Sequence, residues 1–496
     1  MIEAVRGLAS NPAAPPEVVL RLLAAAPEAT AAGLGRRREL PLPVQEAMLR
    51  HPSAVVRATL ARHPGIDPGI RARLLADPEW RRASQAFGAP GQPPLTGDEL
   101  AGLLSRIEDA PGELFTREEL WGELLDRTRD DQGVYEAAAA HPDPRVRCRG
   151  ARAASWIGEP VRAALLADPA PEVRAAAAAV IAESERVMQP DDLPERHCHG
   201  TWAVLQQPLS RALVDQVVAG GDTSELSFVG PNPSTPPDVV DALLDHPVAE
   251  VRRRLAARAD LTPAQLHRLA TDAEAEVRTA VSVHPGLSEE QRATIAIDVS
   301  TATGHGHYGP RRLCRGDGHD FVNERVPALA DALRWARSVN PLLRRRAARH
   351  PELPADLVQA LAGDPDLGVR VLLAQSHPAA PPALLLRSFL EYTGCGRDRL
   401  SARPRFPVDG LAAFADHADP AVRRLVALDP HAVGDLIERL GADPDPAVRR
   451  AMAACPRLPV PRIVALLDDA ELAGSAAANP ALPAGRMAAI AAGAGS

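Results

Sequence analysis

The sequence predicts an all-α protein, a solenoid of two-helix repeats of about 26 residues that is interrupted by insertions. Three observations lead to this fold class. An apolar residue followed by arginine recurs at a constant spacing along the chain. The 49 prolines suit short helices separated by turns, because a proline inside a long helix breaks it. The 496-residue chain also exceeds the length at which one hydrophobic core stops growing, which favours several domains or a repeat array.

The apolar-arginine pair sets the period. Neighbouring pairs lie 26 residues apart, as at Val251 and Val277 or at Val422 and Val448. The longer gap from Val173 to Val251 is 78 residues, a multiple of the same period. A fixed period of this length is typical of a solenoid. The pairs begin at Val5, Val56, Trp80, Val146, Val173, Val251, Val277, Leu343, Val369, Val422 and Val448.

Residues 350–377 show what one repeat contains. Pro354 stands where a first helix begins, and Gly363 with Asp364-Pro365 ends it. A second helix follows. The predicted buried stripes are Leu357, Val358 and Leu361 on the first helix and Val369, Leu372 and Leu373 on the second. Neither short helix can bury its apolar face alone, so stability must come from neighbouring repeats.

The arginine of the pair is expected to have a local acidic partner. An aspartate lies four residues before it in four repeats, at Asp143, Asp366, Asp419 and Asp445. Three of these aspartates precede a proline, which predicts a helix start with an aspartate cap. Because the acids accompany the arginines, we interpret the arginines as internal caps and ion pairs. The alternative is an exposed cationic stripe that binds phosphates.

Residues 445–469 resemble the leucine-rich repeat variant family, whose units combine an Asp-Pro, a Val-Arg, an Ala-rich helix, a Leu-Pro and a Leu-containing helix. Residues 168–180 match the first half of that outline. The resemblance covers about two-thirds of the chain and implies a right-handed superhelix of alternating helices. Some members carry an N-terminal cysteine cluster for an iron–sulfur centre, but the first cysteine here is Cys148, so no cofactor is expected. HEAT-like solenoids, with longer units, are the structural alternative.

Four stretches interrupt the pattern and divide the chain. They are an acidic helical insertion at 88–136, an insertion at 187–229, a basic His/Gly-rich insertion at 297–340 and an Arg/Pro insertion at 391–410. The sequence therefore predicts repeats at 1–87, 137–186, 230–296, 341–390 and 411–496. Insertions in solenoids often lie on the binding face.

Arginines concentrate in one region. Residues 301–350 hold ten arginines against four acidic residues, together with Tyr308, Phe321 and Trp335. Such a region suits phosphate and base contacts, and it equally suits steering toward a charged protein. The predicted binding surface consists of Arg311, Arg312, Arg315, Arg344, Arg345, Arg346, Arg349, Arg397, Arg399, Arg403 and Arg405.

Catalytic and metal chemistry are not expected. The types that ligate zinc gather at His305, His307, Cys314 and His319, but their spacing fits no standard zinc module and the glycines among them favour a plain loop. Residues 197–199 are His, Cys and His, but we expect no metal site there because side chains adjacent in sequence point in different directions. The chain has no lysine, and it contains neither GxSxG nor HExxH. We therefore expect no catalytic residue, no metal and no cofactor.

The expected function is a non-enzymatic scaffold that binds another protein. A nucleic-acid-binding protein that uses residues 301–350 is the alternative, although the net charge of −8 argues against nucleic acid along the whole surface. A metal-dependent or DNA-repair enzyme on a helical-repeat scaffold is the third possibility. Five scattered cysteines, no signal peptide and no apolar run of ~20 residues predict a cytoplasmic protein without membrane contact. The partner, the oligomeric state and the binding face stay open.

Overall fold

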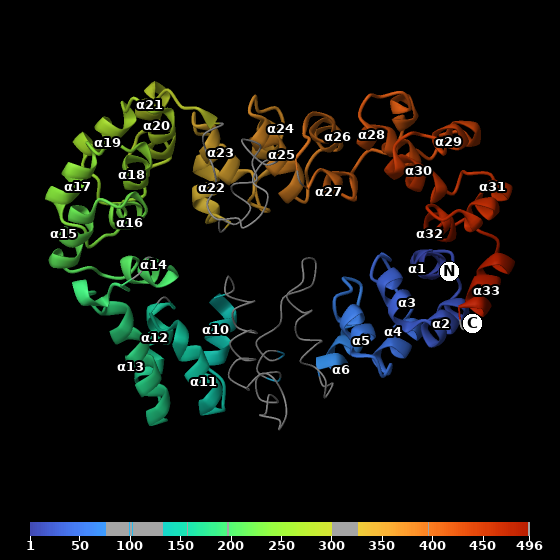
Figure 1. The fold of residues 1–496 in the computed structure, drawn as a ribbon, viewed down its shortest axis with the longest axis horizontal. Coiled ribbons are helices and arrows are strands. Elements are labelled where there is room, and N and C mark those ends of the chain that lie inside the picture. The colour runs from blue at the N-terminus through green and yellow to red at the C-terminus, as the bar shows by residue number, and fades with distance from the viewer. Residues whose placement is uncertain are drawn as a thin grey trace. The chain divides into compact units, whose positions relative to one another are not determined.

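The computed structural model describes residues 1–75, 99, 102, 132–155, 157–195, 198–299, 326–394 and 396–494 (Figure 1). These residues form helices joined by turns, and among them only Met188 and Leu209 form an isolated parallel bridge. The protein is therefore all-α, as predicted. It divides into a first unit, Met1–Ile181 with Val408–Ser496, and a second unit, Ala182–Pro407.

The first unit is built from two separate stretches of the chain. Its N-terminal stretch contains α1 (Ile2–Ser10), α2 (Pro16–Ala25), α3 (Pro27–Leu34), α4 (Leu42–Leu49), α5 (Ala54–Ala61), α6 (Pro68–Leu75), α10 (Gln132–Ala139), α11 (Pro144–Gly150), η1 (Ala151–Ala153), α12 (Glu159–Leu166) and most of α13 (Pro171–Glu185). Its C-terminal stretch contains η5 (Leu411–Phe414), α28 (Pro420–Arg423), η6 (Arg424–Leu428), α29 (Gly434–Leu440), α30 (Pro446–Ala453), α31 (Val460–Ala465), η7 (Leu466–Asp468), α32 (Ala473–Ala477) and α33 (Ala484–Gly493).

The second unit is one continuous stretch. It contains η2 (Pro190–Asp192), α14 (His199–Leu205), α15 (Arg211–Gly220), α16 (Thr223–Val229), α17 (Pro237–Leu243), α18 (Ala249–Leu255), α19 (Pro263–Ala270), α20 (Ala275–Val281), α21 (Glu289–Thr294), α22 (Leu329–Trp335), α23 (Pro341–Ala347), α24 (Ala355–Ala362), α25 (Leu367–Ser376), α26 (Pro382–Glu391) and α27 (Arg397–Ser401).

The helices begin where the sequence places them. Asp143 caps α11 by accepting a hydrogen bond from the amide of Arg145 at 2.9 Å, and Pro144 follows at the first helical position. Asp366, Asp419 and Asp445 cap α25, α28 and α30 in the same way. The predicted helix starts are confirmed.

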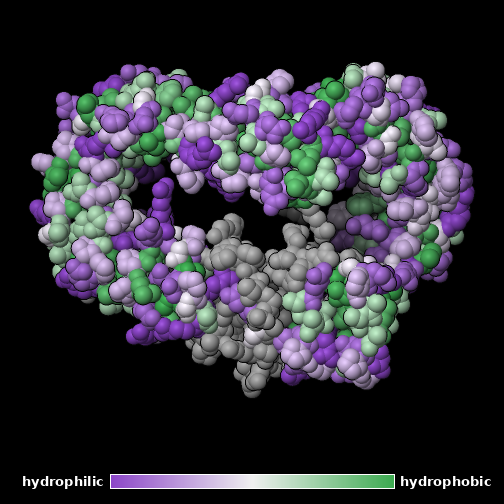
Figure 2. Space-filling view, turned by 180° about the vertical axis from the view of Figure 1, so that it is seen from behind, coloured by the Kyte–Doolittle hydropathy of each residue, from purple (hydrophilic) through white to green (hydrophobic). Residues whose placement is uncertain are grey.

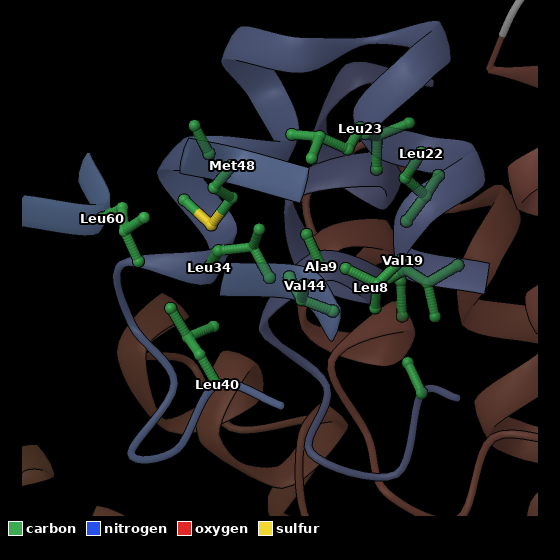
Figure 3. Close-up of a cluster of buried hydrophobic side chains, with 14 of the residues drawn as sticks. Leu8, Ala9, Val19, Leu22, Leu23, Leu34, Leu40, Val44, Met48 and Leu60 are labelled. Atoms are coloured by element: carbon green, nitrogen blue, oxygen red, sulfur yellow. The ribbon is translucent and has the colours of Figure 1, made fainter. Parts of the chain in front are cut away.

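Many of the described helices pack on the helix two positions further along the chain. In the first unit α1 packs on α3 and α3 on α5, while in the second unit α16 packs on α18 and α18 on α20. The predicted stripes lie inside this packing: Leu357, Val358, Leu361, Val369, Leu372 and Leu373 are all buried. Figure 3 shows part of the corresponding core of the first unit, to which α1 contributes Leu8, α3 contributes Leu34 and α4 contributes Met48. Hydrophilic and hydrophobic residues are interspersed on the surface seen in Figure 2.

The N-terminal helices also pack on the C-terminal helices of the same unit. α1 packs on α32 and α2 on α33. Gly7 of α1 faces Gly474 of α32 so closely that a Cβ atom at Gly7 would lie 1.9 Å from the carbonyl oxygen of Gly474. Asn11 donates to the carbonyls of Ala477 at 3.0 Å and Asn479 at 2.7 Å. Within the first unit, the last helices of the chain therefore pack against the first ones as a neighbouring repeat would.

Two stretches expected as insertions contain helices that pack like repeats. Within 187–229, α14 packs on α16 and α16 on α18. Within 391–410, α27 packs on α25, and Arg403 donates to the carbonyl of His377, 26 residues earlier, at 2.5 Å. The apolar-arginine pair is missing from both stretches, although the stacking continues through them.

Candidate functional site

The repeated arginine links two consecutive turns. Nη1 of Arg147 donates to the carbonyls of His141 and Pro142, each at 2.8 Å, and so closes the turn before its own helix. Nε and Nη2 donate to the two carboxylate oxygens of Asp168, at 2.7 and 2.9 Å, in the turn of the next repeat. The same double arrangement joins Arg252 to Asp272, Arg344 to Asp364 and Arg423 to Asp443.

The ion-pair partner predicted from the sequence was wrong. The arginines pair with acidic residues 20 to 22 positions after them: Arg147 with Asp168, Arg423 with Asp443, Arg370 with Glu391 and Arg449 with Glu471. The aspartate four residues before the arginine instead caps the helix, because a short carboxylate at the cap position turns toward the free amides of the first turn. The hydrogen bond from Arg147 holds the pKa of Asp168 below its ordinary value. The arginines therefore act between repeats as well as within them.

A second set of polar side chains joins each turn to the turn 26 residues earlier. His63 donates from Nε2 to the carbonyl of Arg37 at 2.9 Å, and Arg37 donates from Nε to the carbonyl of Ala9 at 2.7 Å. The second unit has the same series of bonds. His284 bonds to the carbonyl of Arg258, and Arg258 bonds to the carbonyl of Gly230. Asn232 continues the series by donating to the carbonyl of Leu205. His63, His284 and Asn232 each precede a proline in the sequence, a pattern that predicts a helix end but not these bonds.

Four of the predicted binding arginines hold the repeats together. Arg344 pairs with Asp364, and Arg345 is buried and pairs with Asp366 at 2.7 Å. Arg397 is also buried. It donates to the carbonyl of Phe389 at 2.7 Å, and its guanidinium lies 4.5 Å from the centre of the Phe389 ring. Arg403 bonds to the carbonyls of Gln375 and His377.

The remaining predicted arginines are placed differently. Arg399 and Arg405 are exposed, and Arg405 donates to the carbonyl of Ala379 at 2.9 Å. Arg346 and Arg349 are half-buried on or after α23. Arg311, Arg312 and Arg315 lie outside the described residues, as do His305, His307, Cys314 and His319. The role of the predicted arginines in binding therefore stays a prediction.

A cavity of about 700 Å³ lies beside Trp335 in the second unit. We call it the Trp335 pocket. One wall comes from residues 283–292, around α21, and the other from residues 333–346, which include the end of α22 and most of α23. The lining residues are Val283, Pro285, Leu287, Ser288, Glu289, Arg292, Leu333, Arg334, Trp335, Arg337, Leu343 and Arg346. The pocket thus lies between the end of the repeats predicted at 230–296 and residues on both sides of the predicted boundary at 340.

Hydrogen bonds fix the two walls relative to each other. Glu289 accepts from the hydroxyl of Ser338 and from the amide of Val339, both at 2.8 Å. Asn340 donates to the carbonyl of Ser282 at 3.1 Å and to its hydroxyl at 2.7 Å. Ser282, Ser338 and Asn340 are buried, so water competes little for these bonds. The pocket is therefore a preformed feature of the second unit.

The lining side chains combine apolar surface with positive charge. Leu287 and Leu343 are buried, and Trp335 is half-buried. Arg334 and Arg337 are 67% and 62% exposed, and each forms an ion pair with an exposed aspartate, Asp331 and Asp356. The basic region is evident in the sequence, but the role of these two arginines is not, because only the folded chain brings them to the same cavity as the leucines.

Arg292 lines the same pocket but is buried. Its side chain is 5% exposed, and burial lowers the pKa of its guanidinium. The two terminal nitrogens donate to the carbonyls of Leu287 and His284 at 2.5 and 2.6 Å. Its Nε has no hydrogen-bond partner, although it too is buried. A buried donor without an acceptor is costly, so a ligand oxygen here would relieve that cost.

Within the described ranges, no group of three or more His, Cys, Asp or Glu side chains gathers where it could hold a metal ion. The helices described here are also too short or too polar to cross a bilayer.

No protein-family model matches the sequence, and no curated protein matches it.

Proposed function

We propose that the chain is a right-handed solenoid of the leucine-rich repeat variant type and that it acts as a non-enzymatic scaffold that binds another protein. The helix packing at every second position and the bonds between turns 26 residues apart support the solenoid. The scattered cysteines favour a reducing compartment, so we place this binding in the cytoplasm.

The Trp335 pocket is the observation that carries the proposed function. Tryptophan and arginine are the residues that most often dominate the binding energy of protein interfaces, in pockets from which water is excluded. Here Trp335 lies beside Arg334 and Arg337 in one preformed cavity with a buried leucine floor. In contrast, several repeated arginines of the array are paired with acidic residues of the next repeat, so they support a structural role better than a phosphate-binding stripe.

Nucleic acid is the second candidate ligand. The same tryptophan could stack on a base while the arginines contact phosphates, and Arg399 and Arg405 add exposed positive charge in the second unit. We rank it second because Arg344 and Arg345, two of the predicted phosphate ligands on α23, are committed to Asp364 and Asp366.

Site-specific photo-crosslinking tests the proposed function. Amine-reactive reagents are unsuitable because the chain has no lysine. A photoreactive phenylalanine analogue placed at Val339, which is 51% exposed beside the pocket, should crosslink to a protein in the native cell extract. The matched control carries the analogue at Val433, which is 65% exposed in the first unit, and should give much less product. A crosslinked product that nuclease digests, or equal products from both positions, would refute a protein-binding site here.

A further inference from the structure

The Trp335 pocket has the size and lining of a site for a few side chains. Its volume of about 700 Å³ is in the range of cavities that bind small ligands or anchor residues of a peptide. Leu287 and Leu343 form an apolar floor, and the half-buried Trp335 adds a flat apolar face. This part of the pocket fits one apolar side chain.

The polar part of the pocket is positively charged. Its lining includes four arginines, at 292, 334, 337 and 346, against the single carboxylate of Glu289. Glu289 is already occupied by the bonds from Ser338 and Val339. The partners of Arg334 and Arg337 are exposed aspartates, and exposed ion pairs are weak enough for a ligand carboxylate to replace them. The site therefore favours an anion beside an apolar group.

We propose that the Trp335 pocket binds an acidic linear segment of the partner protein, with an apolar side chain on Trp335 and carboxylates on Arg334 and Arg337. This inference rests on the proposed function and names the chemistry of its partner. Guanidinium groups match carboxylates in a paired geometry.

A carboxylate-bearing peptide fits better than a nucleic-acid strand. A strand needs a track of cations that follows successive phosphates. Among the described residues, Arg344 and Arg345 next to the pocket are bonded to Asp364 and Asp366, so these two do not continue such a track. The floor of leucines also suits an aliphatic or aromatic side chain, whereas stacked bases need a longer open platform.

Selection from a random twelve-residue peptide display library on the full chain tests the proposal. The selected peptides should carry aspartate or glutamate on both sides of one apolar residue. Synthetic copies, measured by fluorescence anisotropy, should bind more weakly as salt rises. Arg337→Glu and Trp335→Ala should each weaken binding about tenfold or more, the loss expected of a hot-spot residue.

Matched controls separate binding from folding. Arg211→Glu makes the same charge change at an exposed ion pair elsewhere in the second unit, and it should leave the affinity unchanged. Trp335→Phe keeps an aromatic face and should lose less than Trp335→Ala. Circular dichroism should show the same helix content in all variants, because Arg337 is 62% exposed.

Three outcomes would overturn the proposal. The first is a set of selected peptides without acidic residues, and the second is binding that neither Arg337→Glu nor Trp335→Ala weakens. The third is a twenty-nucleotide single strand that displaces the peptides and itself depends on Trp335, which would make the pocket a nucleic-acid site. If the photoreactive group at Val339 still crosslinks to a protein while the peptide experiment fails, the scaffold function stands and only the acidic-segment assignment is lost.

Discussion

Removal of one buried asparagine tests whether the bonds between turns stabilise the array. Asn479 is fully buried, and its side chain donates to the carbonyls of Ala453 at 2.9 Å and Cys455 at 2.6 Å. Its oxygen also accepts from the amide of Ala481 at 2.9 Å. Asn479→Ala removes all three bonds, and among the backbone groups that lose a bond the carbonyl of Cys455 keeps only the amide of Leu458. At about 0.5–1.5 kcal/mol for each bond, the first unit should lose about 2–4 kcal/mol of unfolding free energy.

The matched variant Asn11→Ala asks whether α1 and α32 meet as ordinary neighbouring repeats do. Asn11 makes the same three kinds of bond, to Ala477, Asn479 and Ala13. Its loss should therefore cost a similar amount, about 2–4 kcal/mol. Urea titration followed by circular dichroism measures both variants, and an unchanged slope with denaturant shows that they unfold to the same extent. A large loss in Asn479→Ala beside no loss in Asn11→Ala would refute the packing of α1 on α32.

Three further perturbations probe the core, the helix contact and the titrating groups. Val369→Asp places a charge at a fully buried position, so the melting temperature and helix content by circular dichroism should fall, and unchanged values would contradict its place in the core. Gly7→Val sets side-chain atoms against the carbonyl of Gly474, so it should lower the melting temperature, whereas Gly485→Val, where a Cβ atom meets nothing, should have little effect of this kind. Burial lowers the pKa of His63 below its ordinary value, so the folded state binds fewer protons than the unfolded chain. Stability should therefore be retained above the ordinary value of ~6.5 and lost as pH falls below it. The fall in melting temperature from pH 7.5 to 5.5 should be smaller in His63→Asn, and an equal fall in both proteins would exclude His63 as its cause.

The local features of the fold could be predicted from the sequence. The spacing of Leu357, Val358 and Leu361 follows from the geometry of a single helix, and all three are buried as expected. The aspartate before a proline predicts the helix start, and Asp143 caps α11 accordingly. These features depend on residues within one or two turns, so a single sequence is sufficient to identify them.

Contacts between repeats could not be predicted in the same way. The pairing of Arg147 with Asp168 depends on how one repeat packs on the next, and the nearer Asp143 was a plausible but wrong partner. The stretch 391–410 was interpreted as an insertion because it lacks the apolar-arginine pair, whereas Arg403 bonds to a turn 26 residues earlier as a repeat does. The packing of α1 on α32 has no signal in the sequence at all.

The candidate site depends on the same missing information. Trp335 and its neighbouring arginines were recognised as part of a basic region, but the pocket also needs Leu287 and Arg292 from the repeat before the 297–340 stretch. The hydrogen bonds from Ser338 and Asn340 bring these two segments together. A pattern of charge along the chain gives no information about such a pairing.

The packing of α1 on α32 changes which helices of the first unit are exposed to fraying. In a linear repeat protein the terminal units have one neighbour, so they open first and usually need a polar cap. Here α1 lies between α3 and α32, and each of its two apolar sides is covered. The spatial order of the helices, from α30 through α32 and α1 to α3, thus differs from their order in the chain. A circularly permuted chain in which residues 484–494 lead by a short linker into residues 1–10 would keep every one of these neighbours.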